Sequence, residues 1–147
     1  LAKAISSLIG YLTERENGYS NRKTMRLITA KNICRLCAAG EKFKEQYDDY
    51  NSLFNEPMMI IDDLGEEPRE VLVYGMIHTP IIDIISERYA KQHMTIVTTN
   101  LETDDLKEKY GPRIYDRFQE MLTPIVFENE SYRTKRRKDS NPLEYQG

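Results

Sequence analysis

Two adjacent aspartates, Asp62 and Asp63, come directly after four consecutive apolar residues, 58–61. Neighbouring carboxylates repel each other, which makes this pair electrostatically costly on its own. A divalent cation removes that cost, and Mg²⁺ in particular favours hard oxygen ligands while retaining several of its waters. The residue types and their adjacency therefore indicate a site that works with Mg²⁺.

The aspartates can act only if a strand delivers them to the edge of a sheet. Apolar runs predict strands at 25–30, 58–62 and 94–100, and helical patterns separate these strands. Such an order is typical of an α/β fold, with a parallel sheet and helices on both of its faces. Asn100 ends the third run, and the carboxyl ends of parallel strands meet at one edge. We therefore expect Asp62, Asp63 and Asn100 to line one crevice.

The remaining elements follow from periodicity and from chain-breaking residues. Helices are expected over 1–12, over 31–55 with a break near Gly40, and over 70–91 with an interruption near Pro80. Two short helices, 103–109 and 112–121, precede a last predicted strand at 124–128. We expect residues 1–133 to form one domain and residues 134–147 to form a basic, disordered tail.

Composition limits the class of protein. The chain has 147 residues, of which 39% are hydrophobic and 31% charged, as in one globular domain with a real core. Its net charge of −3 argues against general polyanion binding, although "RTKRRKD" is locally basic. The sequence lacks both a signal-peptide pattern and an apolar run near the roughly 18 residues that span a bilayer. We expect a cytoplasmic protein that does not enter membranes.

Cys34 and Cys37 have the CxxC spacing of a redox pair or of half a metal site. A zinc site needs two further ligands, and the two histidines, His78 and His93, are distant single residues. We therefore interpret the cysteines as two thiols of an ordinary helix in a reducing compartment.

Four motifs, in order, carry a resemblance to a known family. "MMIIDDLGEE" resembles the Walker B segment of the AAA+ ATPases, and "TIVTTNL" resembles their sensor 1. "YGPRIYDRF" is similar to the arginine-finger segment, and "ENESYR" to the sensor 2 region. The "IDDLG" form resembles the branch that contains the bacterial helicase loader DnaC and the transposition helper IstB. The resemblance covers nearly the whole chain and implies a P-loop NTPase-type sheet.

The resemblance implies roles for the residues of the crevice. Asp62 corresponds to the aspartate that holds Mg²⁺, directly or through water. Asp63 occupies the place where many AAA+ proteins have a catalytic glutamate that orients the attacking water. Asn100 would hydrogen-bond that water or the γ-phosphate.

It also implies roles for three arginines. Arg117, helped by Arg113 four residues earlier on the same predicted helix face, would act on the nucleotide of a neighbouring subunit in a head-to-tail homo-oligomer. The alternative is an exposed pair countered by Asp116 and Glu120. Arg133 corresponds to the nucleotide-binding sensor 2 arginine, or it is the first residue of the basic tail.

One departure from the family concerns phosphate binding. The P-loop, GxxxxGK[ST], should precede the first helix, and the sequence does not contain it. We therefore expect an N-terminally truncated AAA+ core that lacks the first strand and the P-loop. ATP and Mg²⁺ would be cofactors of the intact ATPase, and the chain as given would be inactive.

The resemblance favours an ATP-dependent DNA replication protein of the helicase-loader type, with a replicative helicase and single-stranded DNA as partners. A transposition helper ATPase that recruits a transposase shares every motif quoted above. A nucleotide-independent interaction module that lost its P-loop is a third alternative. The acidic residues Glu41, Glu45, Asp48 and Asp49 favour an ordinary solvated helix over the region 31–55. The alternative is a DNA surface to which the same region contributes basic residues and stacking aromatics, together with the basic tail. These residues are Arg35, Lys42, Phe43, Lys44, Tyr47 and Tyr50.

Overall fold

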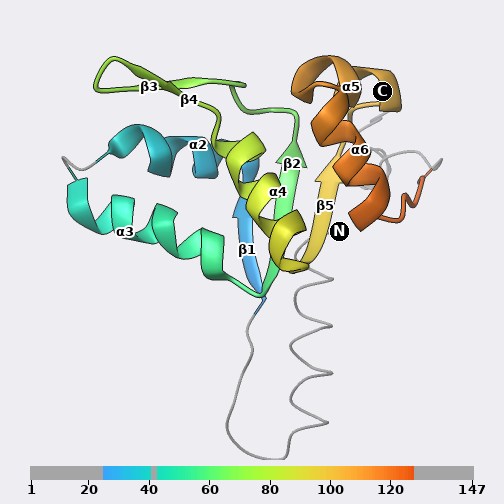
Figure 1. Ribbon diagram of the computed structural model, residues 1–147, viewed down its shortest axis with the longest axis horizontal. Helices are drawn as coiled ribbons and strands as arrows, with labels where there is room; N and C mark the ends of the chain where they lie inside the picture. The colour runs from blue at the N-terminus through green and yellow to red at the C-terminus, as the bar shows by residue number, and fades with distance from the viewer. Residues whose placement is uncertain (1–24, 41–42, 128–147) are drawn as a thin grey trace, which may run out of the picture.

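Three parallel strands form the centre of the protein in a computed structural model that describes residues 25–40 and 43–127 (Figure 1). They are β1 (Arg26–Thr29), β2 (Met58–Leu64) and β5 (Met94–Thr99), in the order β1-β2-β5. Residues Arg26 to Thr29 pair with Met59 to Asp62, and Met58 pairs with Met94. The predicted parallel α/β sheet is therefore confirmed.

Helices connect the strands largely where the periodicity places them. They are α2 (Ala30–Ala39), α3 (Lys44–Ser52), the short 3-10 helix η2 (Leu53–Asn55), α4 (Pro80–Lys91), α5 (Thr103–Tyr110) and α6 (Pro112–Met121). The predicted break near Gly40 is confirmed. Gly40 has a φ of +58°, and a Cβ atom there would lie 3.0 Å from Cγ1 of Val73. Within the described ranges, no helix is both long enough and apolar enough to span a bilayer.

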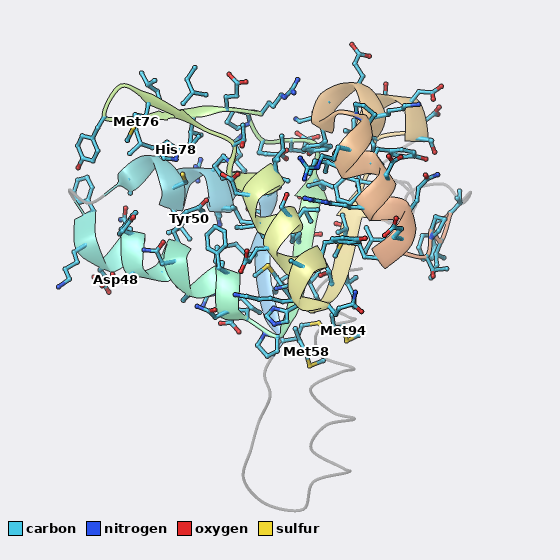
Figure 2. The ribbon with its side chains drawn as sticks, in the orientation of Figure 1. Asp48, Tyr50, Met58, Met76, His78 and Met94 are labelled. Atoms are coloured by element: carbon cyan, nitrogen blue, oxygen red, sulfur yellow. The ribbon has the colours of Figure 1, made fainter. Side chains whose placement is uncertain are left out.

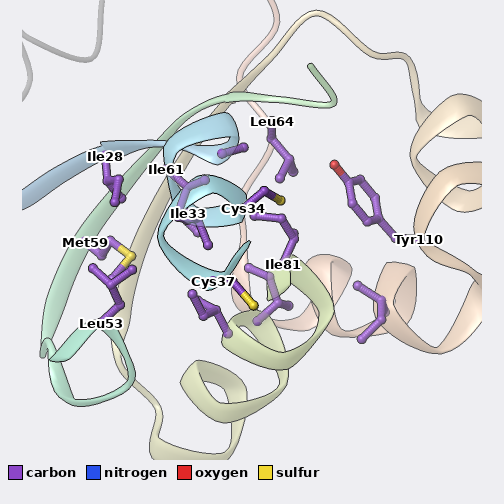
Figure 3. Close-up of a cluster of buried hydrophobic side chains, with 14 of the residues drawn as sticks. Ile28, Ile33, Cys34, Cys37, Leu53, Met59, Ile61, Leu64, Ile81 and Tyr110 are labelled. Atoms are coloured by element: carbon purple, nitrogen blue, oxygen red, sulfur yellow. The ribbon is translucent and has the colours of Figure 1, made fainter. Parts of the chain in front are cut away.

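The main core lies between one face of the sheet and the helices. Met59 and Ile61 of β2 point into it and meet buried residues of α2, η2, α4, α5 and α6 (Figure 3). Ile60 points to the opposite face, where a smaller cluster forms around it and Met25. The buried aliphatic and aromatic side chains of the described helices all belong to the main core. Helices are predicted on both faces of the sheet. The described residues show helices on one face only.

The prediction of helix over residues 70–79 is wrong, because this segment forms a β-hairpin. Its strands, β3 (Val71–Val73) and β4 (Met76–His78), pair antiparallel and lie over α2 (Figure 1). Tyr74 and Gly75 both have positive φ, as a tight type I′ hairpin turn requires. Pro80 occupies the first turn of α4, and the residue before a proline disfavours helix. These two local signals override the helical periodicity.

The hairpin is attached to the body by one face only. Val71 and Val73 pack against the main core. Leu72 and Ile77 form a cross-strand pair on the outer face, and each is 68% exposed.

The predicted last strand is also wrong over residues 124–127, which form no regular structure. Ile125, Val126 and Phe127 are 75%, 81% and 64% exposed. Strand propensity reflects packing against neighbouring strands, and among residues 25–40 and 43–127 no strand pairs with this segment. An apolar segment therefore remains open to solvent beyond α6.

Arg88 is fully buried and joins α4 to the start of β5. Its Nε donates to Thr95 Oγ1 at 2.8 Å, and its Nη1 and Nη2 donate to the carbonyl oxygens of Glu56 and Met94 at 2.7 and 2.5 Å. Burial lowers the pKa of Arg88 to about 10, so the guanidinium remains charged at neutral pH. Three neutral acceptors thus hold one buried cation.

We expect Arg88→Met to lower the free energy of unfolding by about 3 kcal/mol, because the buried acceptors lose their donors. Denaturant unfolding followed by circular dichroism measures the change. Arg35→Met, at an exposed position of α2, is the matched control and should change the value by no more than about 0.5 kcal/mol. Equal stability of both variants would show that the Arg88 hydrogen bonds contribute nothing.

Candidate functional site

Asp62 lies at the carboxyl end of β2 and is held by the neighbouring strand. The hydroxyl of Thr98 in β5 donates to Asp62 Oδ1 at 2.5 Å. The same Thr98 oxygen accepts the backbone N–H of Asp63 at 3.0 Å. One threonine therefore fixes the side chain of the first aspartate and the backbone of the second.

A β-bulge occurs at the two aspartates. Ile61 pairs with Val97 and Leu64 with Thr99, so β2 advances three residues while β5 advances two. Asp63 takes up the extra residue with a left-handed φ of +55°, and its side chain is exposed. Bulges of this kind re-aim side chains and are frequent beside active sites. Here the bulge leaves the Asp62 carboxylate against β5 and the Asp63 side chain in solvent.

The predicted convergence at one sheet edge is confirmed. Asp62 pairs with Thr29, the last residue of β1, and Asn100 follows the pair formed by Thr99 and Leu64. Asp62, Asp63 and Asn100 thus share the carboxyl edge, with Asn100 exposed. Among the described residues, no three His, Cys, Asp or Glu side chains are grouped so that they could hold a metal together. A cation at Asp62 or Asp63 would therefore take most of its ligands from water or from a bound phosphate.

Sequence reasoning missed Glu67, which is a fully buried carboxylate just beyond the two aspartates. The side chain of Glu67 has no exposed surface. Its Oε2 accepts the backbone N–H of Gly65 at 2.8 Å, and its Oε1 accepts the hydroxyl of Tyr110 at 2.5 Å. A glutamate surrounded by charged residues in "GEEPRE" carries no local signal of burial, because its side-chain partner Tyr110 lies 43 residues later.

Lys109 completes this buried group. Its Nζ donates to the carbonyl oxygens of Gly65 and Glu67 at 2.6 and 2.7 Å and lies 3.7 Å from Glu67 Oε1. Burial and the hydrogen bond to Glu67 raise the pKa of Tyr110, so its phenol stays a donor. We call Glu67, Lys109 and Tyr110 the Glu67 clamp.

The two candidate arginines of α6 have different environments. Arg117 is partly buried, donates to Ser86 Oγ of α4, and lies over the ring of Tyr89 at 5.3 Å from its centroid. Arg113 is exposed. Both arginines lie on α6, four residues apart as predicted, and of the two only Arg113 is exposed. Arg133 lies outside the described residues.

Part of the expected DNA surface is not available. Tyr50 is 8% exposed and packs edge-on against Phe54, with ring centroids 5.3 Å apart. Figure 2 shows Tyr50 on the inner side of α3, whereas Asp48 lies on its outer side. Phe43 is 55% exposed and remains free to stack. Lys42 and the basic tail lie outside the described residues.

Cys34 and Cys37 are free and buried on α2, as predicted for two thiols of an ordinary helix. Burial raises the pKa of Cys34 to about 12, assisted by the nearby Glu67 carboxylate. Burial also raises the pKa of Cys37. Both sulfurs are therefore protonated at neutral pH, which makes them poor nucleophiles and poor metal ligands.

The site can place a cation, a water molecule and a polar amide together at one sheet edge. Asp62 is fixed, whereas Asp63 and Asn100 are accessible to a ligand. This is the donor set expected for orienting water near a phosphate. Neither a comparison with protein-family models nor a comparison with curated proteins found a match for the chain.

We expect both cysteines of the native protein to resist an aromatic disulfide reagent at pH 8, because reaction requires an accessible thiolate. In denaturant, absorbance should report two reactive thiols per chain. Ala38→Cys is the control, since this exposed position on the same helix should react at once. Rapid native reaction of Cys34 or Cys37 would restore a redox interpretation of the pair.

Proposed function

We propose that this chain is part of an AAA+ ATPase of the helicase-loader type, with ATP and Mg²⁺ as cofactors. One observation carries the proposal: Asp62 and Asp63 lie near the carboxyl end of the central parallel strand, Thr98 of the next strand holds both of them, and Asn100 lies at the same edge of the sheet. Ligands of open α/β sheets bind at this carboxyl edge. The proposal also draws on the resemblance of four ordered motifs to that family.

The open side of β5 supports the proposal independently of the motifs. β5 is an edge strand of the described sheet, and its residues Ile96 and Val97 are only partly buried. The exposed apolar segment 124–127 lies after α6 without a strand partner. A further parallel strand beside β5 would cover these apolar groups. A P-loop following that strand would emerge at the same edge as Asp62.

In the proposed reaction each polar residue at the carboxyl edge of the sheet has a separate role. The Thr98 hydroxyl holds Asp62, which would bind Mg²⁺ directly or through water. Asp63 projects beyond the bulge and would orient the attacking water. Asn100 would hydrogen-bond this water or the γ-phosphate. The bound Mg²⁺ would neutralise charge on the phosphates.

The proposed partners are a replicative helicase and single-stranded DNA. The support for DNA is local, because Arg35, Lys44 and Phe43 are exposed around α2 and α3. Basic groups would meet phosphates and the aromatic ring would stack on a base. Salt should then weaken binding steeply.

We expect residues 1–147 to bind ATP weakly or not at all, because a P-loop supplies the amides and the lysine that hold the β- and γ-phosphates. In a chain extended by its upstream coding sequence, Asp62→Asn should weaken Mg²⁺-dependent ATP binding. Asp63→Asn should lower turnover more than binding. Titration calorimetry and phosphate release measure these effects.

Asp104→Asn is the matched control, because Asp104 is an exposed acidic residue of α5 outside the crevice. Its binding and turnover should equal those of the unchanged chain. Micromolar ATP binding by residues 1–147 would contradict the role given to the P-loop. Unaltered turnover in both Asp62→Asn and Asp63→Asn would remove the ATPase assignment.

We expect Arg113 to act on the nucleotide of a neighbouring subunit, while Arg117 supports α6 by contacting Ser86 and Tyr89. A fixed guanidinium beside the transferred phosphoryl group is worth about 10³-fold or more in rate. In the extended chain, Arg113→Ala should therefore bind ATP but not hydrolyse it. Mixing it with an inactive Asp63→Asn protein should restore some turnover. In the mixed assembly, a subunit with an intact Asp63 can receive the intact Arg113 of its neighbour.

The control mixture contains one partner that carries both changes, so that no complete site can form. Arg117→Ala should mainly lower the free energy of unfolding. If the two single variants co-assemble and turnover stays absent, the arginine does not act between subunits.

A further inference from the structure

We propose that Glu67 is a positioning residue, which sets the segment 63–67 and joins it rigidly to the helix pair α5–α6. This segment begins at the bulge of β2 and is called the Asp63 loop. The inference rests on the proposed function for its catalytic meaning. Its structural part rests on contacts within the described residues. No motif of the resemblance includes a role for Lys109 or Tyr110.

The Asp63 loop has a strained backbone that needs support from other parts of the protein. Asp63 has a φ of +55°, which non-glycine residues rarely adopt, and Gly65 follows with a φ of +109°. A Cβ atom on Gly65 would lie 2.6 Å from Leu101 Cδ1, so only glycine fits there. The backbone N–H of Glu66 closes the turn on the Asp63 carbonyl at 3.2 Å. The direction of the Asp63 side chain is therefore set by this turn together with the Thr98 hydroxyl, which accepts the Asp63 N–H.

Glu67 supplies this support from inside the protein. Its carboxylate accepts the N–H of Gly65, and its own carbonyl and that of Gly65 both accept from Lys109. Two carbonyl groups of the loop, those of Gly65 and Glu67, are thus held at the carboxyl end of α5. A buried carboxylate is stable here because a cation and two hydrogen-bond donors surround it.

The clamp continues into α6, which carries Arg113. Tyr110 donates to Glu67 and packs edge-on against Phe118 of α6, with ring centroids 5.8 Å apart. Tyr110, Ile114 and Phe118 are all buried in the main core. The contacts therefore run without a gap from the Asp63 loop through α5 to the arginine-bearing helix. A change at the Asp63 loop would be transmitted to the face that we propose meets the next subunit.

Hydrogen exchange of residues 1–147 tests the clamp without any enzymatic activity. In Glu67→Gln, loss of the charge-assisted hydrogen bonds should speed exchange by about tenfold in both segments 63–68 and 103–110. Tyr110→Phe removes a single hydroxyl and should give a smaller change in the same two segments. Glu66→Gln, at the exposed neighbouring position, and Lys107→Met, on the same helix as Lys109, are matched controls that should change neither.

A response confined to one of the two segments would overturn the coupling, as would an equal response in Glu66→Gln. Exchange that rises equally in β1 and α2 would report general unfolding. In that case Tyr110→Phe tests the clamp, because this variant keeps the aromatic ring in the core and removes only the hydrogen bond to Glu67. No joint response of the two segments in Tyr110→Phe would overturn the clamp.

Kinetics of the upstream-extended chain test positioning. Glu67→Gln should lower kcat about tenfold with little change in the KM for ATP, because Asp63 would act after the nucleotide binds. Glu66→Gln should leave both constants unchanged. Unaltered kcat beside altered exchange would overturn the positioning role while leaving the clamp in place. An extended wild-type chain without ATPase activity would defeat the proposed function, and the exchange result would still decide the clamp.

Discussion

The pairing of β2 between β1 and β5 is the constraint on which the rest of the structure depends. It buries Met59, Ile60 and Ile61 on the two faces of the sheet and leaves none of them exposed. A central strand must satisfy its backbone hydrogen bonds on both sides, which fixes its register to both neighbours. That register in turn determines where Asp62 leaves the sheet.

The carboxyl edge combines Asp62, which the sheet holds rigidly, with the Asp63 loop, whose position depends on further contacts. Thr98 belongs to a paired strand and holds Asp62 by its hydroxyl. One residue later the bulge interrupts regular pairing, so the Asp63 loop needs contacts from outside the sheet in addition to the Thr98 hydroxyl. The Glu67 clamp provides them from α5 and links the position of a proposed water-orienting group to packing between helices. Sheet pairing thus positions Asp62, and helix packing helps to position the next residue, Asp63.

Local pattern was sufficient for most elements and failed at two. α6 begins and ends as the periodicity indicates, and β2 extends two residues past its predicted end. The hairpin at β3–β4 is not predicted, because the apolar spacing over 70–91 is typical of a helix and hides the turn signal at Tyr74 and Gly75. The segment 124–127 has a strand composition, but a strand needs a neighbour, and sequence periodicity does not report whether one is present.

The sequence by itself determined the α/β class, the parallel strands, the carboxylates near the end of the central strand and the placement of the cysteine pair on a helix. These follow from apolar periodicity and from residue type, which act over a few positions. Only the tertiary structure decided that Glu67 is buried, that Arg117 contacts α4 while Arg113 is exposed, and that Tyr50 faces the core. The contacts of Glu67 with Tyr110 and of Arg117 with Ser86 join residues that are 43 and 31 positions apart. Their meeting depends on how the elements pack, and local sequence carries no record of it.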